Sequence, residues 1–195
     1  MKTLIAASAA ALMSSTLANA QELRLPQSDF EMTLRIHDRS NDQEQEIEME
    51  MRHRAGDFRM EGEFQGHSAI LLASPADRML TVLADMGGAR MAIQMPMDDD
   101  VTLPLADERF GEVVGSDRVA GEPCTIYRVE DEDIPGGEAL GCMTDDNIVL
   151  RVTDMDNVPM LVATQFARRA QDASLFTVPA GYQIMQMPAG MSFPR

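Results

Sequence analysis

The feature that most constrains the fold of this chain is a two-residue alternation of apolar and charged side chains. In EIEMEMRHR, residues 46–54, Ile47, Met49, Met51 and His53 share one parity, and only glutamate and arginine occupy the other. Successive side chains of a β-strand point to opposite faces of its sheet. The pattern therefore predicts a strand with one apolar face and one charged face.

The same alternation recurs in other segments, and turn-forming residues separate them. Two runs, AILLA and MLTVLA, are apolar on both parities, which is typical of strands covered on both faces. The connections between these segments are short, which favours antiparallel pairing of successive strands. We expect about ten strands in meander order, at residues 29–37, 44–54, 57–65, 68–73, 78–84, 89–97, 112–119, 123–130, 138–144, 147–153 and 158–168.

A sheet with one apolar face must cover that face, and the sequence offers few helices to do so. We therefore predict an all-β fold in which a mainly antiparallel sheet curls into an unclosed barrel or half-barrel with few short helices. The segment DDDVTLPLADERFG, from residue 98, is expected to be a flap or short helix. QDASLFTVPAGY, from residue 171, is expected to form one helical turn and a Pro-Gly turn, before a loose tail.

The apolar parity supplies the candidate binding site. Methionine accounts for 17 residues, and flexible thioether side chains adapt to irregular apolar partners. We expect a hydrophobic small molecule or lipid to lie against the concave wall, in contact with Met32, Leu34, Ile47, Met49, Met51, Phe58, Met60, Phe64, Met91, Ile93 and Met95.

The N-terminus predicts export. Lys2, the apolar run from Leu4 to Leu12 and Ala18-Asn19-Ala20 have the form of a cleaved Sec signal peptide over residues 1–20. Residues 21–195 are then expected to form a single periplasmic domain. No later segment has the roughly 20 apolar residues that a membrane-spanning helix needs.

The two cysteines, Cys124 and Cys142, are expected to pair in an oxidising compartment. A hairpin folding about Asp133 would place Ile126 opposite Leu140 and Arg128 opposite Glu138. The disulfide would then be a structural cross-link of that hairpin.

Charge and motifs exclude several functions. With 32 acidic and 16 basic residues, the chain is a polyanion, which argues against a nucleic-acid partner. Catalytic motifs built on Gly-x-Ser-x-Gly, His-Glu-x-x-His or phosphate-binding glycine loops do not occur. We predict no enzymatic activity and no cofactor, and we interpret the calcium-loop-like DMDN at residues 154–157 as a turn.

The C-terminal half resembles a known family. RVAGEPCTIYRVE, GGEALGCMTDDNIVLRV and LFTVPAGYQIM, within residues 110–187, are similar to an uncharacterised exported bacterial family related to the lipoprotein-localisation carriers. The matching motifs are Gly121-x-x-Cys124, Cys142 and the segment from Phe176 to Tyr182. The resemblance implies an unclosed antiparallel barrel with a hydrophobic concave face, and it implies an acyl-chain or hydrophobic-ligand carrier.

Two other functions remain open. Soft thioethers bind Cu(I), so Met49, Met51 and His53, or Met95 and Met97, or Met185, Met187 and Met191, suggest a copper-binding envelope stress protein. However, alternate residues of one strand are about 7 Å apart and need help from a neighbouring strand to chelate one ion. The third possibility is a structural or interaction domain with no small ligand.

Overall fold

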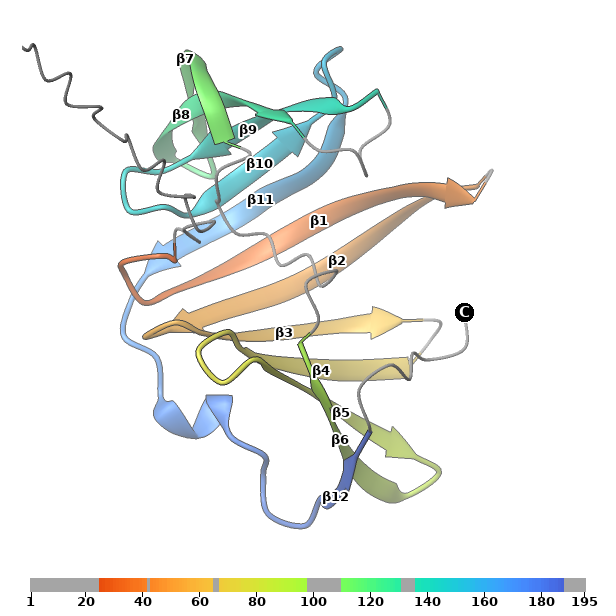
Figure 1. The fold of residues 1–195 in the computed structure, drawn as a ribbon. Coiled ribbons are helices and arrows are strands. Elements are labelled where there is room, and N and C mark those ends of the chain that lie inside the picture. Colours follow the sequence, from red (N-terminus) through yellow and green to blue (C-terminus); the bar gives the residue numbers. More distant parts are fainter. Residues whose placement is uncertain (1–24, 42, 65–66, 98–109, 131–135, 188–195) are drawn as a thin grey trace, which may run out of the picture.

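The computed structural model describes residues 25–41, 43–64, 67–97, 110–130 and 136–187. Within these ranges the chain forms one 12-stranded sheet, antiparallel except at one edge and not closed into a barrel (Figure 1). The predicted all-β fold class is confirmed. The strands are β1 (Phe30–Asn41), β2 (Gln43–Arg54), β3 (Asp57–Phe64), β4 (His67–Ser74), β5 (Met79–Met86), β6 (Ala89–Pro96), β7 (Phe110–Val119), β8 (Glu122–Glu130), β9 (Glu138–Met143), β10 (Val149–Thr153), β11 (Pro159–Arg168) and β12 (Gln183–Gln186).

The strand order is β12-β6-β5-β4-β3-β2-β1-β11-β10-β9-β8-β7. Strands β1–β6 and β7–β11 are each a meander, as predicted, but the two meanders join through β1 and β11 and not through β6 and β7. The predicted meander order therefore holds within each part of the sheet, but β6 and β7, which are successive in the chain, are not neighbours. Pairing β1 with β11 puts the first strand in the middle of the sheet, where the apolar faces of both halves meet.

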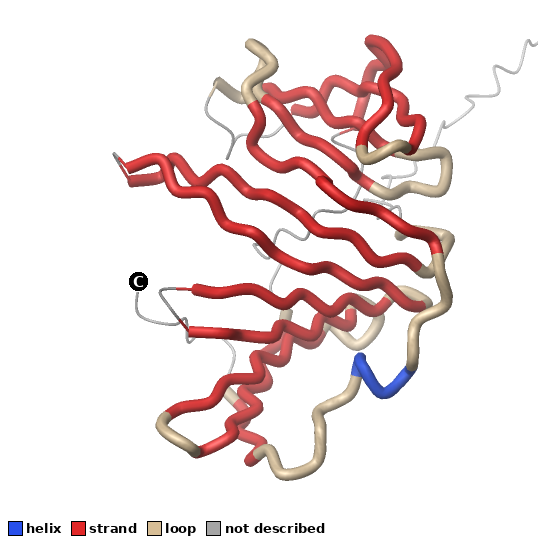
Figure 2. The backbone as a smooth tube through the Cα atoms, turned by 180° about the vertical axis from the view of Figure 1, so that it is seen from behind, coloured by secondary structure: helices blue, strands red, loops and turns tan. Residues whose placement is uncertain are grey.

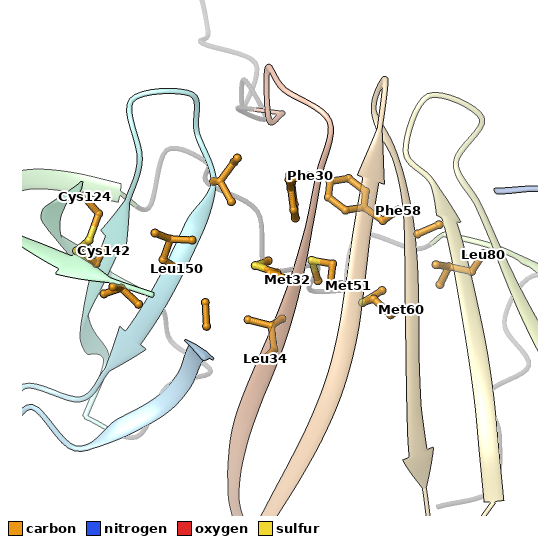
Figure 3. Close-up of a cluster of buried hydrophobic side chains, with 14 residues drawn as sticks. Phe30, Met32, Leu34, Met51, Phe58, Met60, Leu80, Cys124, Cys142 and Leu150 are labelled. Atoms are coloured by element: carbon orange, nitrogen blue, oxygen red, sulfur yellow. A yellow bond between two sulfur atoms is a disulfide. The ribbon is translucent and has the colours of Figure 1, made fainter. Parts of the chain in front are cut away.

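The sheet curls so that both halves contribute to one core (Figure 2). Phe30, Met32 and Leu34 of β1 belong to the same buried cluster as Cys142 of β9 and Leu150 of β10. Figure 3 shows these side chains in a band that runs across the strands, from Cys142 and Leu150 to Phe30, Met32 and Leu34. Burial of this shared apolar face is the main stabilisation available to a fold with few helices.

Two-residue hairpins set the register of the N-terminal half. Ala55 and Gly56 connect β2 to β3 with φ of 50° and 97°. Positive φ at both central positions is the geometry of the type I′ turn, whose twist matches that of the flanking strands. The register that follows pairs His53 with Phe58 and Met51 with Met60, so the apolar parities of the two strands lie on the same face.

The outer face of β3–β6 is covered by the segment that follows β11. Leu72, Leu83 and Ala92 form a second buried cluster, against which Val178 and Tyr182 pack. This cover explains why the runs AILLA in β4 and MLTVLA in β5 are apolar on both parities. The predicted helical turn is present as the 3-10 turn η1 (Ala173–Phe176).

Strand β12 was not foreseen from the sequence. It runs parallel to β6 at the edge of the sheet and pairs Met185 with Ile93. A four-residue segment with two glutamines has little alternation to identify it, and its position depends on the long-range return of the chain.

The disulfide Cys124–Cys142 is present, with a Cα–Cα distance of 5.4 Å. The predicted register of its hairpin is wrong by two residues, because Ile126 lies opposite Cys142 and Arg128 lies opposite Leu140. The disulfide therefore crosses the strand pair diagonally. The ion pair between Arg128 and Glu138 forms nevertheless, at 3.3 Å, since long side chains span a diagonal.

Several expectations fall on residues that the structure does not describe. These are the signal peptide at residues 1–20, most of the expected flap (98–109), the final eight residues (188–195) and the side chain of Phe64. No helix among the described residues is long and apolar enough to cross a bilayer.

Candidate functional site

The strand register places the expected wall residues on one face of the sheet. One row across the strands contains Met32, Met51, Met60, Leu71, Val82 and Ile93. A second row contains Leu34, Met49, Gly62, Ala69, Ala84 and Met91. Phe58 and Met95 follow in a third row, and Ile47 lies opposite Ile36 of β1. Glutamate and arginine side chains of β1–β3 lie on the other face.

The centre of this apolar face is closed. The exposed fraction is 4% for Met32, 0% for Leu34, 1% for Met51 and Phe58, and 7% for Met60. Five of the expected binding residues are therefore core residues, with no free surface to offer a ligand. Alternation identified the correct face, but it cannot distinguish a wall that is filled from one that is open.

Two ends of the same face remain partly accessible. Ile47 and Met49 of β2 are half-buried, as are Met91, Ile93 and Met95 of β6. The row between them is made of small side chains, Gly62, Ala69 and Ala84, all of which are half-buried. We call this row of small, half-buried residues over β3–β5, with Met49 at one end and Met91 at the other, the trough.

The trough opens into a cleft at the junction of β2 and β3. The last paired residues of these strands are Met49 and Gly62, and beyond them the two strands diverge (Figure 1). The cleft has a volume of about 710 Å³. Ile47, Met49, Gly62 and Ala69 line its apolar side. A volume of this order is typical of a small-molecule site.

The outer side of the cleft is acidic. Its lining contains Glu46, Glu48, Glu50, Glu61 and Glu63, and no arginine. Glu61 accepts hydrogen bonds from Arg59 and Arg52, which lie outside the lining, and the bond from Arg59 is the main reason that its pKa is lowered. Glu61 is therefore ionised at neutral pH and adds to the negative charge of this side.

His53 is a core residue and not a metal ligand. Its ring is 1% exposed and lies between Phe30 and Phe58, with ring centroids 5.3 and 4.8 Å away. Nδ1 lies 2.9 Å from the carbonyl oxygen of Ser28, and Nε2 accepts the N–H of Gly56 at 3.0 Å. The carbonyl can only accept, so Nδ1 carries the proton. Both nitrogens are occupied, and burial lowers the pKa of the ring.

The methionines considered for copper occur at several places in the sheet, and Met191 lies outside the described residues. Met49 and Met51 lie in different rows, and the cross-strand neighbours of Met51 are Met32 and Met60, all three buried in the core. Met185 is 50% exposed at the sheet edge. No group of three or more His, Cys, Asp or Glu side chains suited to a metal ion occurs among the described residues.

The expected turn at DMDN is confirmed. Asp154 accepts the backbone N–H groups of Asp156 and Val158 at 3.0 and 2.8 Å, and Asn157 has a φ of 63°. A carboxylate that caps its own turn has its oxygens directed at backbone donors, which accounts for the aspartate without an ion.

Sequence reasoning missed the cleft itself. Its two sides come from β2 and from the β3–β4 hairpin, and only the last shared pair, Met49 and Gly62, shows where the strands separate. No sequence signal marks this separation, because β3 extends to Phe64 and still leaves Ile47 and Glu48 of β2 unpaired with it.

No protein-family model matches the sequence, and no curated protein matches it. Solved structures do resemble it. An uncharacterised conserved protein from Thermus thermophilus is 13% identical, with a TM-score of 0.54, and the match covers 82% of this chain and 91% of that protein. MucB in the Pseudomonas aeruginosa MucA/MucB complex is 17% identical with a TM-score of 0.50, and the match covers 87% of this chain and 62% of MucB.

A LolA superfamily protein from Nitrosomonas europaea, NE2245, is 11% identical with a TM-score of 0.39 over 80% of this chain and 92% of that protein. At these identities the comparisons concern the fold alone. The predicted resemblance to the lipoprotein-localisation carriers is confirmed as a resemblance of fold.

Proposed function

We propose that this chain is a periplasmic, non-enzymatic protein that binds a hydrophobic ligand, an acyl chain or lipid, in the trough between Met49 and Met91. The observation that carries the proposal is the cleft of about 710 Å³, which gives solvent access to the apolar face at Ile47 and Met49. Because the centre of the apolar face is buried, the proposed site is limited to the half-buried residues of that face.

The physical basis is the transfer of alkyl groups out of water. Each buried methylene contributes about 0.8 kcal/mol, so an acyl chain in contact with the trough over about six to eight methylenes gains about 5–6 kcal/mol before the losses of binding. Small side chains at Gly62, Ala69 and Ala84 leave space for such a chain, and methionines at its ends adapt to its course. The fold of the similar structures is compatible with this use.

Export is part of the proposal. The signal-like residues 1–20 and the Cys124–Cys142 disulfide both favour an oxidising compartment. Recovery of the protein from the periplasm with Gln21 as its first residue, by N-terminal sequencing, would support this location. A cytoplasmic, uncleaved chain would contradict it.

Binding is tested by displacement of a fluorescent fatty acid, together with native mass spectrometry of the protein purified without detergent. Ala84→Phe should fill the trough and weaken fatty-acid binding at least tenfold. The matched control is Ala167→Phe, because Ala167 is exposed on β11 and pairs with Glu31 on the opposite face. A Cu(I) adduct lost on Met49→Leu would favour the copper alternative, and a protein that binds neither probe would favour an interaction domain.

A further inference from the structure

The edge of β2 that faces the cleft has no strand partner among the described residues. Gln43 and residues 45–48 of β2 pair with β1 on one side, whereas pairing with β3 begins only at Met49. On the other side of the cleft, Glu63 of β3 pairs with Ser68 of β4 and, within the described part of the chain, with no residue of β2. Two strand edges of the same sheet therefore face each other across the cleft, and their described residues are not paired with each other.

We propose that this cleft is the docking site of a partner protein, which inserts an extended segment of alternating basic and apolar residues beside β2. The free edge of six residues is about 20 Å long and presents about three N–H and three C=O groups. A strand added there satisfies these groups, as in other cases of strand addition to a sheet edge.

The residues on the two sides of the cleft indicate which side chains the inserted segment should carry. An inserted strand directs alternate residues to the two faces of the sheet. On the inner face those residues meet Ile47, Met49 and Ala69, and on the outer face they meet Glu48, Glu61 and Glu63. The segment therefore has apolar side chains at one parity and arginine or lysine at the other.

Charge supports a basic partner over a second copy of this chain. Glu46 pairs with Arg35, and Glu50 and Glu61 pair with Arg52. Glu48 and Glu63 are exposed and have no ion-pair partner in the described ranges. A second copy carries the same formal charge of −16 and is repelled, whereas a basic segment is attracted.

The segment shares Met49 and Ala69 with the proposed lipid site, but it also contacts the free edge of β2, whereas the trough extends away over β4 and β5, so the two proposals can be tested separately. The test of strand insertion uses three fluorescein-labelled hexapeptides and the exported chain in an anisotropy titration. The first alternates leucine and arginine, the second has the same composition in two blocks, and the third alternates leucine and glutamate. Only the first should bind with saturation, and its affinity should fall several-fold between about 50 and about 300 mM salt.

The variant with both Glu48→Arg and Glu63→Arg should lose at least tenfold in affinity for the alternating basic peptide and should still bind the fatty-acid probe. The control Glu112→Arg changes an exposed carboxylate on β7, at the opposite edge of the sheet, and should have no effect. Peptide binding should also slow amide hydrogen exchange in residues 43–48.

Equal binding of the block and alternating peptides would overturn strand insertion, because charge alone would then explain the affinity. Unchanged exchange in residues 43–48 would overturn the location. A homodimer abolished by the double variant would assign the cleft to a second copy. Loss of fatty-acid binding in Ala84→Phe with peptide binding intact is expected, since Ala84 is not in the cleft.

Discussion

Replacing His53 by glutamine should remove most of the acid sensitivity of this fold between pH 7.5 and 5.5. The folded protein holds the ring neutral, with Nδ1–H donating to the Ser28 carbonyl and Nε2 accepting from Gly56. Burial lowers the pKa of the folded ring below its ordinary value of 6.5. As the pH falls below 6.5, the unfolded chain takes up this proton first, so the free energy of unfolding decreases.

The magnitude follows from the unfolded pKa of the ring. Above pH 7.5 the penalty is negligible, and at pH 5.5 a ring that stays neutral in the folded state contributes a loss of about 1.4 kcal/mol. Glutamine can donate to Ser28 and accept from Gly56, but it does not titrate. His53→Gln is expected to be less stable at pH 7.5 by about 1–3 kcal/mol, because the packing between Phe30 and Phe58 is lost.

The assay is urea unfolding followed by far-ultraviolet circular dichroism at pH 7.5, 6.5 and 5.5. Phe58→Leu is the matched control, since it disturbs the same cluster but keeps the imidazole and its two hydrogen bonds. The control should lose as much stability as the parent on acidification, and His53→Gln should lose little. Carboxyl groups with a lowered pKa, such as Glu61 and Asp146, also stabilise the fold, and this stabilisation is lost only when the pH falls below their ordinary pKa values near 4. They therefore do not contribute to the change in stability between pH 7.5 and 5.5. An equal loss in His53→Gln and the parent would refute the neutral, buried imidazole.

The remaining predictions concern the C-terminal half. The Cys124→Ser, Cys142→Ser double variant should lower the free energy of unfolding by about 3 kcal/mol, because the disulfide closes a loop with a sequence separation of 18. Urea unfolding with and without reductant measures this loss, and a difference below about 1 kcal/mol would contradict the prediction. Gly141→Ala should lower the free energy of unfolding by about 1–3 kcal/mol, because a Cβ there would lie 2.5 Å from Cε1 of Phe110. The melting temperature should return toward the parent value when Phe110→Leu is added, and no such rescue would show that this contact is not the cause.

The apolar face illustrates what could be predicted from the sequence and what could not. Alternation in residues 46–54 placed Ile47, Met49 and Met51 on the apolar side, and the register agrees. It could not show that Met51 is 1% exposed while Met49 is half-buried. That difference depends on how far β3 extends along β2, which no residue within β2 encodes.

His53 shows the same limit in another form. Its parity indicated an inward position, and Met49 and Met51 on the same parity suggested a copper ligand. In the structure the ring is buried and both of its nitrogens are hydrogen-bonded. Ser28 precedes β1 and Gly56 belongs to the next hairpin, so only the folded sheet brings both groups to one imidazole.

The sequence by itself determined the strands, the short turns, the antiparallel class and the pairing of the two cysteines. These follow from short-range sterics and local chemistry: the two-residue period of a strand, the preference of Gly and Asn for positive φ, and the compartment chemistry of cysteine. Tertiary structure alone decided that β1 pairs with β11, that β12 returns beside β6, and that β2 and β3 diverge beyond Met49 and Gly62. Those features depend on contacts between residues far apart in the chain, whose free energy is gained only when both halves of the sheet are assembled.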